Sequence, residues 1–453
     1  MISKNNKLKK IFAGLLTLLV TSCGNNINYV TQPLNFLSSI NPINNNYIQT
    51  NDNFNNQFQN YKTIKFSENQ IIVKYKNSKF GIAALNDKYE YKPVGVKVVD
   101  SFEYQDAPTQ LHLLPEKMKM QQALEYYQRN PQVEFAVPNA TMSVSMSPGS
   151  QTDFNDPNDP NFAEQWYLPK VNAPQAWQFT NGGSPEVIVA VLDTGVDYNH
   201  PDLKGKIILG PDYIDKDNDP KDEHGHGTHV TGIICAGINN SEGIVGVAPN
   251  VKVMAIRILD KNGNGSLYNI AKAMAYAANN KVRVINLSLG SPPGGIILKT
   301  IAYFVGNYVE RKGALLIAAA GNEGGKVGFP AASSKFMAVG AINERNVLAS
   351  FSNRGKEISV VAPGTNILST FPTYHVTAND SGLPMNYASL NGTSMATPIV
   401  SAQAALIFSR FPYSKPSEVR KLIENNTLDL GEPNKDALYG NGLINISKSL
   451  GIN

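Results

Sequence analysis

Cysteine and tryptophan are scarce in this chain, with two residues of each among 453. Two cysteines cannot build a disulfide scaffold, so a packed core has to hold the fold. Beyond the first 23 residues no apolar run approaches the roughly 18 residues of a membrane-spanning helix. Charged residues make up 17% and apolar residues 42%, a balance that excludes collagen, coiled coil and wholesale disorder.

A basic excess is also lacking over most of the chain. The formal net charge is +4, and the lysines of residues 1–23 alone supply +4 with no acid among them. Residues 24–150 carry +1 and residues 151–453 carry −1. The positive charge therefore belongs to the N-terminal segment, and we expect no nucleic-acid partner.

The first 23 residues have the organisation of an export signal. Lysines precede an apolar run at 11–20 that is too short to cross a bilayer, and small residues follow it. The sequence VTSC (20–23) resembles a bacterial lipobox, whose cysteine is acylated and becomes the new N-terminus. The resemblance implies that Cys23 is lipidated and binds the membrane. An ordinary signal peptide that happens to contain a cysteine is the alternative.

Two segments of different composition follow the signal. Residues 24–60 contain 13 Asn and 4 Gln, have little to bury, and predict a disordered tether. Residues 61–150 contain short apolar strands and one helix, which predicts a small α+β unit without catalytic residues of its own. The strands are expected at 70–75, 96–99, 111–114 and 133–137, and the helix at 116–129.

Residues 151–453 alternate apolar strands with helices. Strands are expected at 187–192, 252–258, 283–289, 314–320, 336–342 and 358–362. Helices are expected at 226–236, 267–279, 297–311, 394–411 and 416–425. This alternation predicts an α/β fold with a parallel sheet flanked by helices, and sites in such folds lie beyond the carboxyl ends of the strands.

Three short segments place polar side chains at strand ends or helix starts. They are VLDTGVD (191–197), HGHGTHV (224–230) and NGTSMATP (391–398). A serine hydroxyl is a poor nucleophile at neutral pH, so it needs a base that takes its proton and returns it to the leaving group. Histidine can do both, and a carboxylate can fix its tautomer. The chain order Asp, His, Ser predicts a hydrolase with a nucleophilic serine.

A fourth segment supports the same chemistry. AAAGNEG (318–324) follows an apolar strand, and its asparagine is a natural donor to a developing oxyanion. The four segments make residues 151–453 resemble a subtilisin-family serine endopeptidase of the thermitase-like branch. The resemblance implies that Asp193, His226 and Ser394 form the triad and that Asn322 is the oxyanion donor.

The resemblance also covers substrate binding. The resemblance implies that the backbone of SLG (288–290) forms a strand that pairs with an extended polypeptide substrate. The implied substrate-binding residues are Ser288, Leu289, Gly290 and Gly321. The surrounding segments are apolar, so we expect broad endopeptidase activity with a preference for apolar or aromatic residues before the cleaved bond.

The histidine cluster leaves two alternatives open. His224, His226 and His229 superficially resemble a His-x-His-x-Asp-His zinc motif, and imidazole is a good zinc ligand. Thr228 occupies the place of that aspartate, and the chain has no second histidine cluster, which disfavours a zinc hydrolase. A catalytically silent surface binding protein is the other alternative, and the presence of all four catalytic groups argues against it.

Structural calcium is a further implication of the resemblance, since loops rich in oxygen ligands suit this hard cation. The implied tight site consists of Asp159, Asp202 and Asn240, with carbonyl oxygens of the loop 237–244. A second site is expected from Asp212, Asp215 and Asp217, for which a solvated acidic loop is the alternative.

Family resemblance gives residues 61–150 a role as an inhibitory propeptide. Subtilase prosegments are small α+β domains that assist folding and then inhibit in cis, and VEFAVPN (133–139) is similar to their last strand. We expect cleavage between about 140 and 156; an accessory domain that is never removed is the alternative. Because Cys23 precedes this unit, cleavage would release a monomeric extracellular enzyme from the cell surface.

Overall fold

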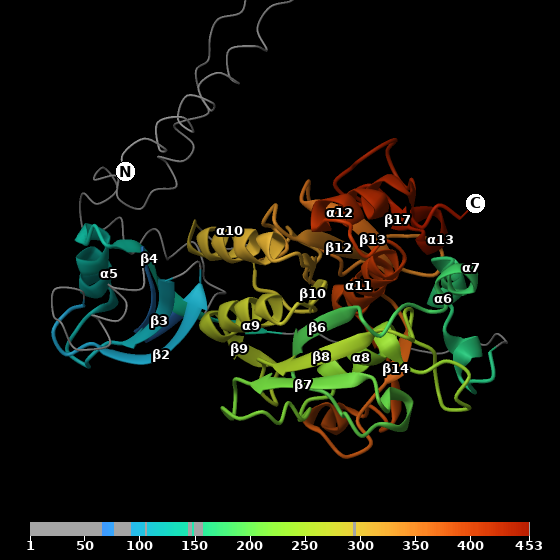
Figure 1. Cartoon of the computed structure of the whole chain (residues 1–453), viewed down its shortest axis with the longest axis horizontal. Coiled ribbons are helices and arrows are strands. Elements are labelled where there is room, and N and C mark those ends of the chain that lie inside the picture. Colours follow the sequence, from blue (N-terminus) through green and yellow to red (C-terminus); the bar gives the residue numbers. More distant parts are fainter. Residues whose placement is uncertain are drawn as a thin grey trace, which may run out of the picture. The chain divides into compact units, whose positions relative to one another are not determined.

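The computed structural model describes residues 66–76, 92–104, 107–143, 147–148, 157–292 and 296–452. All of them belong to one unit, Ile48–Asn453. Figure 1 shows a small strand-rich region in blue and a larger α/β region from green to red. The predicted signal and tether, with Cys23, lie outside the described residues.

A nine-stranded sheet forms the centre of the larger region, in the order β16-β17-β13-β12-β11-β10-β6-β8-β7. All neighbouring pairs are parallel except β16 with β17. The strands are β6 (Ile188–Asp193), β7 (Ile207–Asp212), β8 (Lys252–Arg257), β10 (Val284–Leu287), β11 (Leu315–Ala319), β12 (Met337–Ile342), β13 (Ile358–Pro363), β16 (Thr427–Leu428) and β17 (Leu443–Ile444). The central strands are apolar and buried along nearly their whole length, as expected of a sheet covered on both faces. The predicted fold class is confirmed.

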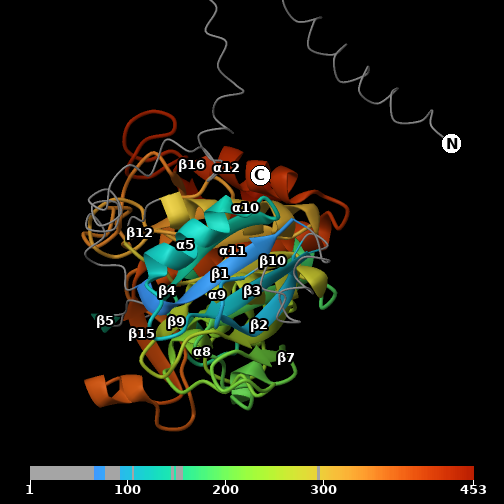
Figure 2. The same cartoon turned by 90° about the vertical axis from the view of Figure 1, so that its left-hand side faces the viewer.

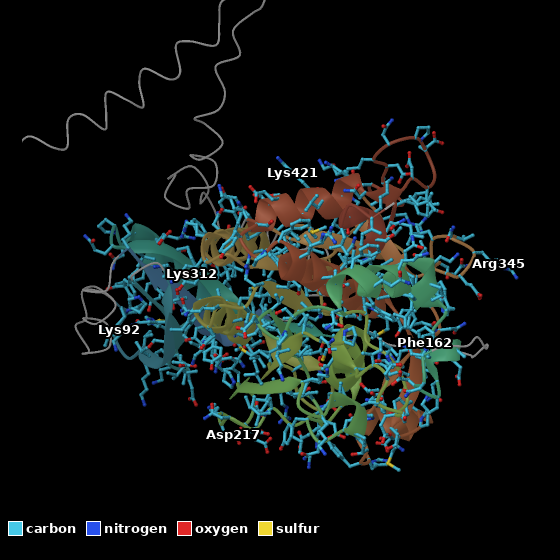
Figure 3. All side chains as sticks on the ribbon, turned by 45° about the vertical axis from the view of Figure 1, so that its right-hand side comes forward. Lys92, Phe162, Asp217, Lys312, Arg345 and Lys421 are labelled. Atoms are coloured by element: carbon cyan, nitrogen blue, oxygen red, sulfur yellow. The ribbon has the colours of Figure 1, made fainter. Side chains whose placement is uncertain are left out.

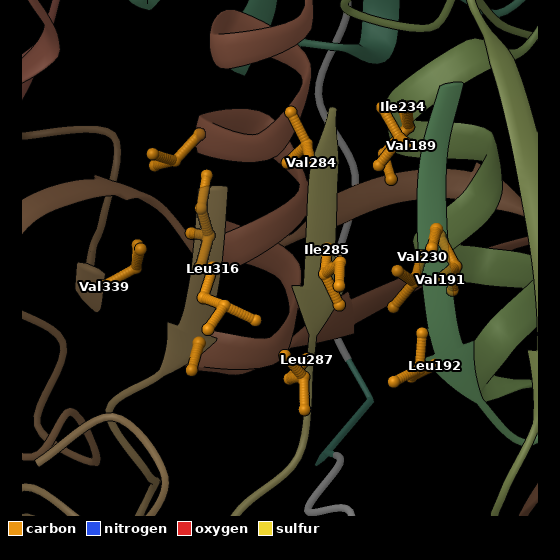
Figure 4. Packing of buried hydrophobic residues seen from close by; sticks show 14 of the residues in the cluster. Val189, Val191, Leu192, Val230, Ile234, Val284, Ile285, Leu287, Leu316 and Val339 are labelled. Atoms are coloured by element: carbon orange, nitrogen blue, oxygen red, sulfur yellow. The ribbon is translucent and has the colours of Figure 1, made fainter. Parts of the chain in front are cut away.

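Helices cover this sheet in two packed pairs, α8 with α11 and α9 with α10. Their bounds are α8 (His226–Cys235), α9 (Leu267–Asn279), α10 (Ile296–Arg311) and α11 (Thr393–Arg410), and smaller helices are α6 (Tyr167–Lys170), α7 (Ala173–Thr180), α12 (Pro416–Asn425) and α13 (Ile446–Ser449). Val230 and Ile234 are four residues apart on α8, so they share one face. Figure 4 shows them beside Val191 and Val189 of β6. This packing fixes α8 against the strand that carries Asp193.

The small region is an antiparallel sheet with one helix, seen from its own side in Figure 2. Its elements are β1 (Phe66–Tyr75), β2 (Lys97–Tyr104), β3 (Ala107–Leu113), α5 (Met120–Arg129) and β4 (Val133–Ser143). Successive residues of β1 face opposite sides. Ile71 and Val73 pack with α5, while Ile72 belongs to the apolar core that continues into the larger region. The sheet therefore has one face for its own helix and one for the α/β region.

Helix predictions from the sequence agree closely with these bounds. α9 and α12 match at both ends, and α8, α10 and α11 match within one residue. α5 is four residues shorter than predicted, because Lys119 keeps an extended backbone conformation at its N-cap. β7 was not predicted, since Gly210 and Pro211 interrupt its apolar pattern. Within the described ranges, no helix is long and apolar enough to cross a membrane.

Candidate active site

Asp193 is the last residue of β6 and has no exposed surface. Its backbone carbonyl accepts hydrogen bonds from the N–H groups of Ile258 and Leu259, just beyond β8. Its side-chain Oδ1 accepts the N–H of Thr194 at 2.8 Å. The carboxylate is therefore fixed from its backbone and its side chain at the carboxyl end of the sheet.

His226 begins α8, and its Nδ1 lies 2.7 Å from Oδ1 of Asp193. Both side chains are buried. The helix reaches this position because residue 227 is glycine: a Cβ there would lie 2.1 Å from the carbonyl oxygen of Gly195. Among the described residues, Nε2 of His226 has no hydrogen-bond partner. The imidazole is thus anchored at one nitrogen, and the other can act as a base.

Ser394 is the second residue of α11 and is 3% exposed. Its hydroxyl donates to the carbonyl oxygen of Ser288 at 3.0 Å. In return, the Ser288 hydroxyl donates to the carbonyl oxygen of Ser394 at 2.8 Å and itself accepts from the amide of Asn286. The segment 288–290 after β10 is therefore tied directly to the serine.

Asn322 follows β11, and its side chain is oriented by the residue before the serine. Its Oδ1 accepts both the N–H and the hydroxyl of Thr393, each at 2.9 Å. The N–H of Gly321 donates to the same Thr393 hydroxyl at 3.2 Å. Since the oxygen is engaged with Thr393, the amide nitrogen is the side of Asn322 that can donate to a substrate oxygen. Thr393 was not identified from the sequence.

The neighbouring histidines do not join His226 in a metal site. Nε2 of His229 lies 3.0 Å from the carbonyl oxygen of Ile367 and 2.9 Å from that of Ala388, and burial lowers the pKa of His229 to about 3. The rings of His224 and His226 are 6.4 Å apart between centroids. No group of three His, Cys, Asp or Glu side chains suited to a metal ion occurs among the described residues. The zinc alternative is therefore not supported.

The end of the small region pairs with short strands of the larger region. Residues 141–143 of β4 pair antiparallel with β9 (Asn264–Ser266). Further along, β5 (Ser147–Pro148) pairs antiparallel with β15 (Tyr387–Asn391), which ends three residues before Ser394 and also pairs with β14 (Ile367–Thr370). Sequence reasoning did not identify β9 as a binding strand, because three residues with a central glycine give no strand signal.

Contacts with α9 and α10 hold the rest of the small region in place. The amine of Lys272 lies 2.6 and 2.7 Å from the two carboxylate oxygens of Asp100. The rings of Phe135 and Phe304 stack at 5.6 Å between centroids. Oδ1 of Asn139 accepts the N–H of Tyr268, in the first turn of α9, at 3.1 Å.

The first predicted calcium site is brought together by the fold. Asp159 and Asp202 are 2% and 1% exposed, and both carboxylates contact the loop of Asn240. Asp159 accepts the N–H groups of Asn239 and Asn240, and Asp202 accepts the amide of Asn240 at 2.9 Å. Burial, assisted by the nearby Asp159, raises the pKa of Asp202 to about 6. A hard divalent cation would compensate these two buried carboxylates, so the residues fit calcium.

The second predicted site does not fit calcium. The guanidinium of Arg257 lies 2.9 Å from Asp212 and 2.7 Å from Asp215, and it also binds Glu223. Asp217 is exposed at the surface (Figure 3) and its Oδ1 accepts the N–H of Asp219. Arg257 already supplies the positive charge of this loop. No local pattern predicts this pairing, because Arg257 lies more than 40 residues from Asp212 and Asp215.

Comparison with known proteins agrees with this geometry. The subtilase family matches residues 184–442, more than half of the chain, and the fervidolysin N-terminal prodomain matches residues 52–139. The thermophilic serine proteinase of Bacillus sp. (strain AK1) is 43% identical over 297 residues, which are 65% of this chain and 67% of that protein. Thermitase of Thermoactinomyces vulgaris is 42% identical over 271 residues, 59% of this chain and 90% of thermitase.

A solved structure covers both regions. Fervidolysin from Fervidobacterium pennivorans, described as a keratinolytic enzyme related to subtilisin, matches 85% of this chain with a TM-score of 0.72 and 26% identity. The match spans 61% of fervidolysin itself, which is the longer protein. The chain therefore belongs to the subtilase family of serine peptidases and carries a prodomain of the fervidolysin type.

Proposed function

We propose that the chain is an endopeptidase that cleaves polypeptides with Asp193, His226 and Ser394 as its triad. The observation that carries this proposal is the 2.7 Å contact between buried Nδ1 of His226 and Oδ1 of Asp193. This contact leaves Nε2 of His226 as the basic nitrogen and stabilises the imidazolium that forms during the reaction.

The reaction begins with proton transfer from Ser394. The hydroxyl turns from the carbonyl of Ser288 to Nε2 of His226, which takes its proton as Oγ bonds to the substrate carbonyl carbon. His226 then gives the proton to the leaving amine as the C–N bond breaks, and an acyl ester remains on Ser394. Water, deprotonated by His226 in the same way, releases the new carboxyl end and regenerates the serine.

Two groups stabilise the negative charge on the substrate oxygen during this step. The amide nitrogen of Asn322 is oriented by Thr393, as described above. Ser394 lies in the first turn of α11, where backbone N–H groups and the positive end of the helix dipole favour an anion. Both act without moving, so the charge is met by donors already in place.

A polypeptide substrate binds as an extended strand. The pairing of residues 141–143 with β9 and of β5 with β15 supports this, because both are antiparallel pairings of the chain's own backbone, and β15 ends three residues before Ser394. Leu289 and Gly290 follow Ser288, whose carbonyl oxygen accepts the Ser394 hydroxyl. The buried Phe329 pairs with Ser291 at the end of the same segment, and none of these residues carries a charge. We therefore retain a broad specificity that prefers apolar residues before the cleaved bond.

The same strand pairing supports a narrower range for the bond that removes the prodomain. Ser143 is the last residue paired with β9, and Ser147 pairs with Asn391, which lies three residues before Ser394. We place the processing bond between Ser143 and Ser147, within the wider range expected from the sequence. Mass spectrometry of the mature enzyme should find an N-terminus at 144, 145, 146 or 147. An N-terminus outside these four positions would contradict the assignment.

The proposed localisation is extracellular, by way of a membrane-bound precursor. Export, acylation of Cys23 and membrane anchoring rest on the sequence of residues 1–23. Calcium bound by Asp159, Asp202 and Asn240 would add stability and take no part in the chemistry, because these residues are not among those that contact the triad.

Casein hydrolysis tests the mechanism. Purified enzyme should degrade casein, a serine-directed sulfonyl fluoride should stop the reaction, and a zinc chelator should leave the serine chemistry intact. Ser394→Ala should abolish hydrolysis, while Ser409→Ala, which removes another partly buried hydroxyl of α11, should retain it. Hydrolysis that only the zinc chelator blocks would overturn the serine mechanism. Processed enzyme without any hydrolysis would support the silent binding protein instead.

A further inference from the structure

A buried carboxylate that takes no part in the proposed chemistry is hydrogen-bonded to residues next to the aspartate and the histidine of the triad. Asp222 has no exposed surface and accepts five hydrogen bonds. Its Oδ1 accepts the hydroxyl of Thr194 at 2.9 Å and the N–H groups of His224 and Gly225 at 3.0 and 2.8 Å. Its Oδ2 accepts the N–H of Thr228 at 2.9 Å and the hydroxyl of Thr228 at 2.6 Å.

These partners flank the triad on both sides. Thr194 follows Asp193 directly, and its hydroxyl also accepts the N–H of Gly227 at 2.9 Å. Gly225 precedes His226, and Thr228 lies two residues after it in the first turn of α8. One side chain therefore connects the end of β6 to the start of α8, where the 2.7 Å contact between Asp193 and His226 is made.

The bonding pattern requires a carboxylate. All five partners are donors, and two of them are hydroxyls that donate to no other acceptor within the described part of the chain. If residue 222 were asparagine, its amide nitrogen would replace one carboxylate oxygen. The two N–H groups of that nitrogen would then face groups that themselves donate hydrogen bonds. Buried hydrogen bonds to a charged acceptor are among the stronger ones in proteins, and a donor left without its acceptor is costly.

We infer that Asp222 is a positioning residue for catalysis, which acts with Thr194 and Thr228 to set the distance and orientation of His226 relative to Asp193. The inference rests on the proposed triad. Asp222 does not contact the substrate or the reacting atoms. Its effect is on how often the imidazole is held where Nε2 can accept the serine proton, so it acts on kcat rather than on substrate binding.

Substitutions at Thr194 separate positioning from general stability. Thr194→Val keeps the shape of the side chain and removes its hydrogen bonds to Asp222 and Gly227, while Thr194→Ser keeps the hydroxyl. We expect Thr194→Val to lower kcat at least tenfold with KM within twofold, and Thr194→Ser to restore kcat to within twofold of the unmodified enzyme. Asp222→Asn should lower kcat further. The substrate is a short chromogenic peptide, and the temperature lies well below the unfolding midpoint of each variant.

Asp436→Asn is the matched control. Asp436 also accepts several backbone N–H groups, those of Glu432, Leu438 and Tyr439, but in a loop before β17. Its substitution should lower the unfolding midpoint and leave kcat within twofold. If Thr194→Val behaved like Asp436→Asn, with reduced stability and unchanged kcat, Asp222 would be structural only and the inference would be wrong.

A spectroscopic measurement keeps the inference testable even if the enzyme proves inactive. In the full-length Ser394→Ala protein, the proton between Nδ1 of His226 and Asp193 should give a far-downfield proton resonance. Adding Thr194→Val should shift or broaden that resonance, and adding Thr194→Ser should restore it. An unchanged resonance in Thr194→Val would overturn the inference. If Thr194→Val changed the resonance but the unmodified enzyme hydrolysed no substrate, the positioning role of Asp222 would stand and the proposed function would be rejected.

Discussion

Asn322 and Ser394 come from different elements, and Thr393 joins them. Its N–H and hydroxyl orient the Asn322 amide, while the next residue, Ser394, is the proposed nucleophile. Asn322 and Ser394 are therefore fixed relative to one another through a single residue. Replacing Asn322 by a side chain of similar size that lacks the amide should impair catalysis.

We predict that Asn322→Leu lowers kcat by about 100- to 1,000-fold with little change in KM, the size of loss observed for such a donor in subtilisin itself. The reason is that the amide nitrogen meets charge that exists only in the transition state. Asn343→Leu is the control, because Asn343 caps a turn after β12 through its own amide oxygen. Steady-state kinetics would contradict the role of Asn322 if both variants lost equal activity.

At this scale the sequence allows a prediction of the catalytic groups but not of the residues that orient them. Asp193, His226, Ser394 and Asn322 were predicted, because each lies in a short segment with glycine alongside. Asp222 was not, because a long-range hydrogen bond of its side chain, from Thr194, is what connects it to the residue after Asp193. Arg257 was not, because its partner Asp212 is distant in the chain. Arg257 pairs with Asp212, 45 residues away, and only the fold brings β8 beside that loop.

Among the elements, β3 of the prodomain contains a buried ionisable residue, His112. Nδ1 of His112 lies 2.5 Å from the hydroxyl of Tyr127 on α5, and Nε2 lies 2.9 Å from Oε1 of Gln110. Burial, with the nearby Lys92 charge, lowers the pKa of His112 to about 3. The folded prodomain thus holds this histidine neutral.

We predict that acid weakens the prodomain through His112. Its folded pKa lies below the unfolded value near 6.5, so the unfolded state binds the extra proton, and stability is lost as pH falls below about 6.5. The loss is up to about 1.4 kcal/mol for each pH unit until the folded pKa is reached. Hydrogen exchange of residues 107–143, followed by mass spectrometry in full-length Ser394→Ala, should show less protection at pH 5 than at pH 7.5.

His112→Gln is the comparison for that experiment. A neutral side chain cannot take up the proton, so protection in this variant should depend less on pH between 7.5 and 5. Equal pH dependence in the two proteins would assign the effect to other groups.

Element prediction succeeded where periodicity is long and failed where it is short. α9 has apolar residues over four turns and begins after Ser266, whose hydroxyl accepts the N–H of Asn269, so both ends were predictable. β9 and β5 have three and two residues and exist only through their partners. β9 pairs with the end of β4, and β5 is itself part of the segment that pairs with β15, so the parts missed are those that pair across the two regions.

For the whole molecule, calcium provides a test of stability. We predict that a calcium chelator lowers the thermal unfolding midpoint, because Asp159 and Asp202 are then left buried without a cation. At calcium 100-fold above its dissociation constant the stabilisation is about 2.7 kcal/mol. Calorimetry should show this shift in the processed enzyme, provided that hydrolysis is blocked with a sulfonyl fluoride.

Two substitutions distinguish the calcium sites. Asp202→Asn should remove most of the chelator effect, whereas Asp215→Asn should leave it intact, because Asp215 binds Arg257 instead. If the chelator had no effect on the unfolding midpoint of Asp215→Asn, calcium would bind at the second predicted site, and our assignment of Asp215 to Arg257 alone would be wrong.

Processing and membrane release are predicted to occur together. Cys23 precedes the prodomain and Ser394 follows it, so cleavage between Ser143 and Ser147 separates the lipid from the protease. In cell fractionation, Ser394→Ala should stay in the membrane at full length, and active enzyme should be soluble. Cys23→Ser should make both forms soluble. Fully processed enzyme that remained in the membrane fraction would contradict this prediction.

The strand pairing of β5 and of residues 141–143 also has a consequence for how activity depends on protein concentration. Before the cut, the prodomain shares a chain with the cleft and competes with substrate at a high effective concentration. After the cut, only noncovalent contacts keep the prodomain bound, namely its packing on α9 and α10 and the pairing of residues 141–143 with β9. Once it dissociates, its concentration at the active site becomes that of the solution. Processed enzyme should therefore gain activity when it is diluted and stay inhibited where many molecules share a small volume.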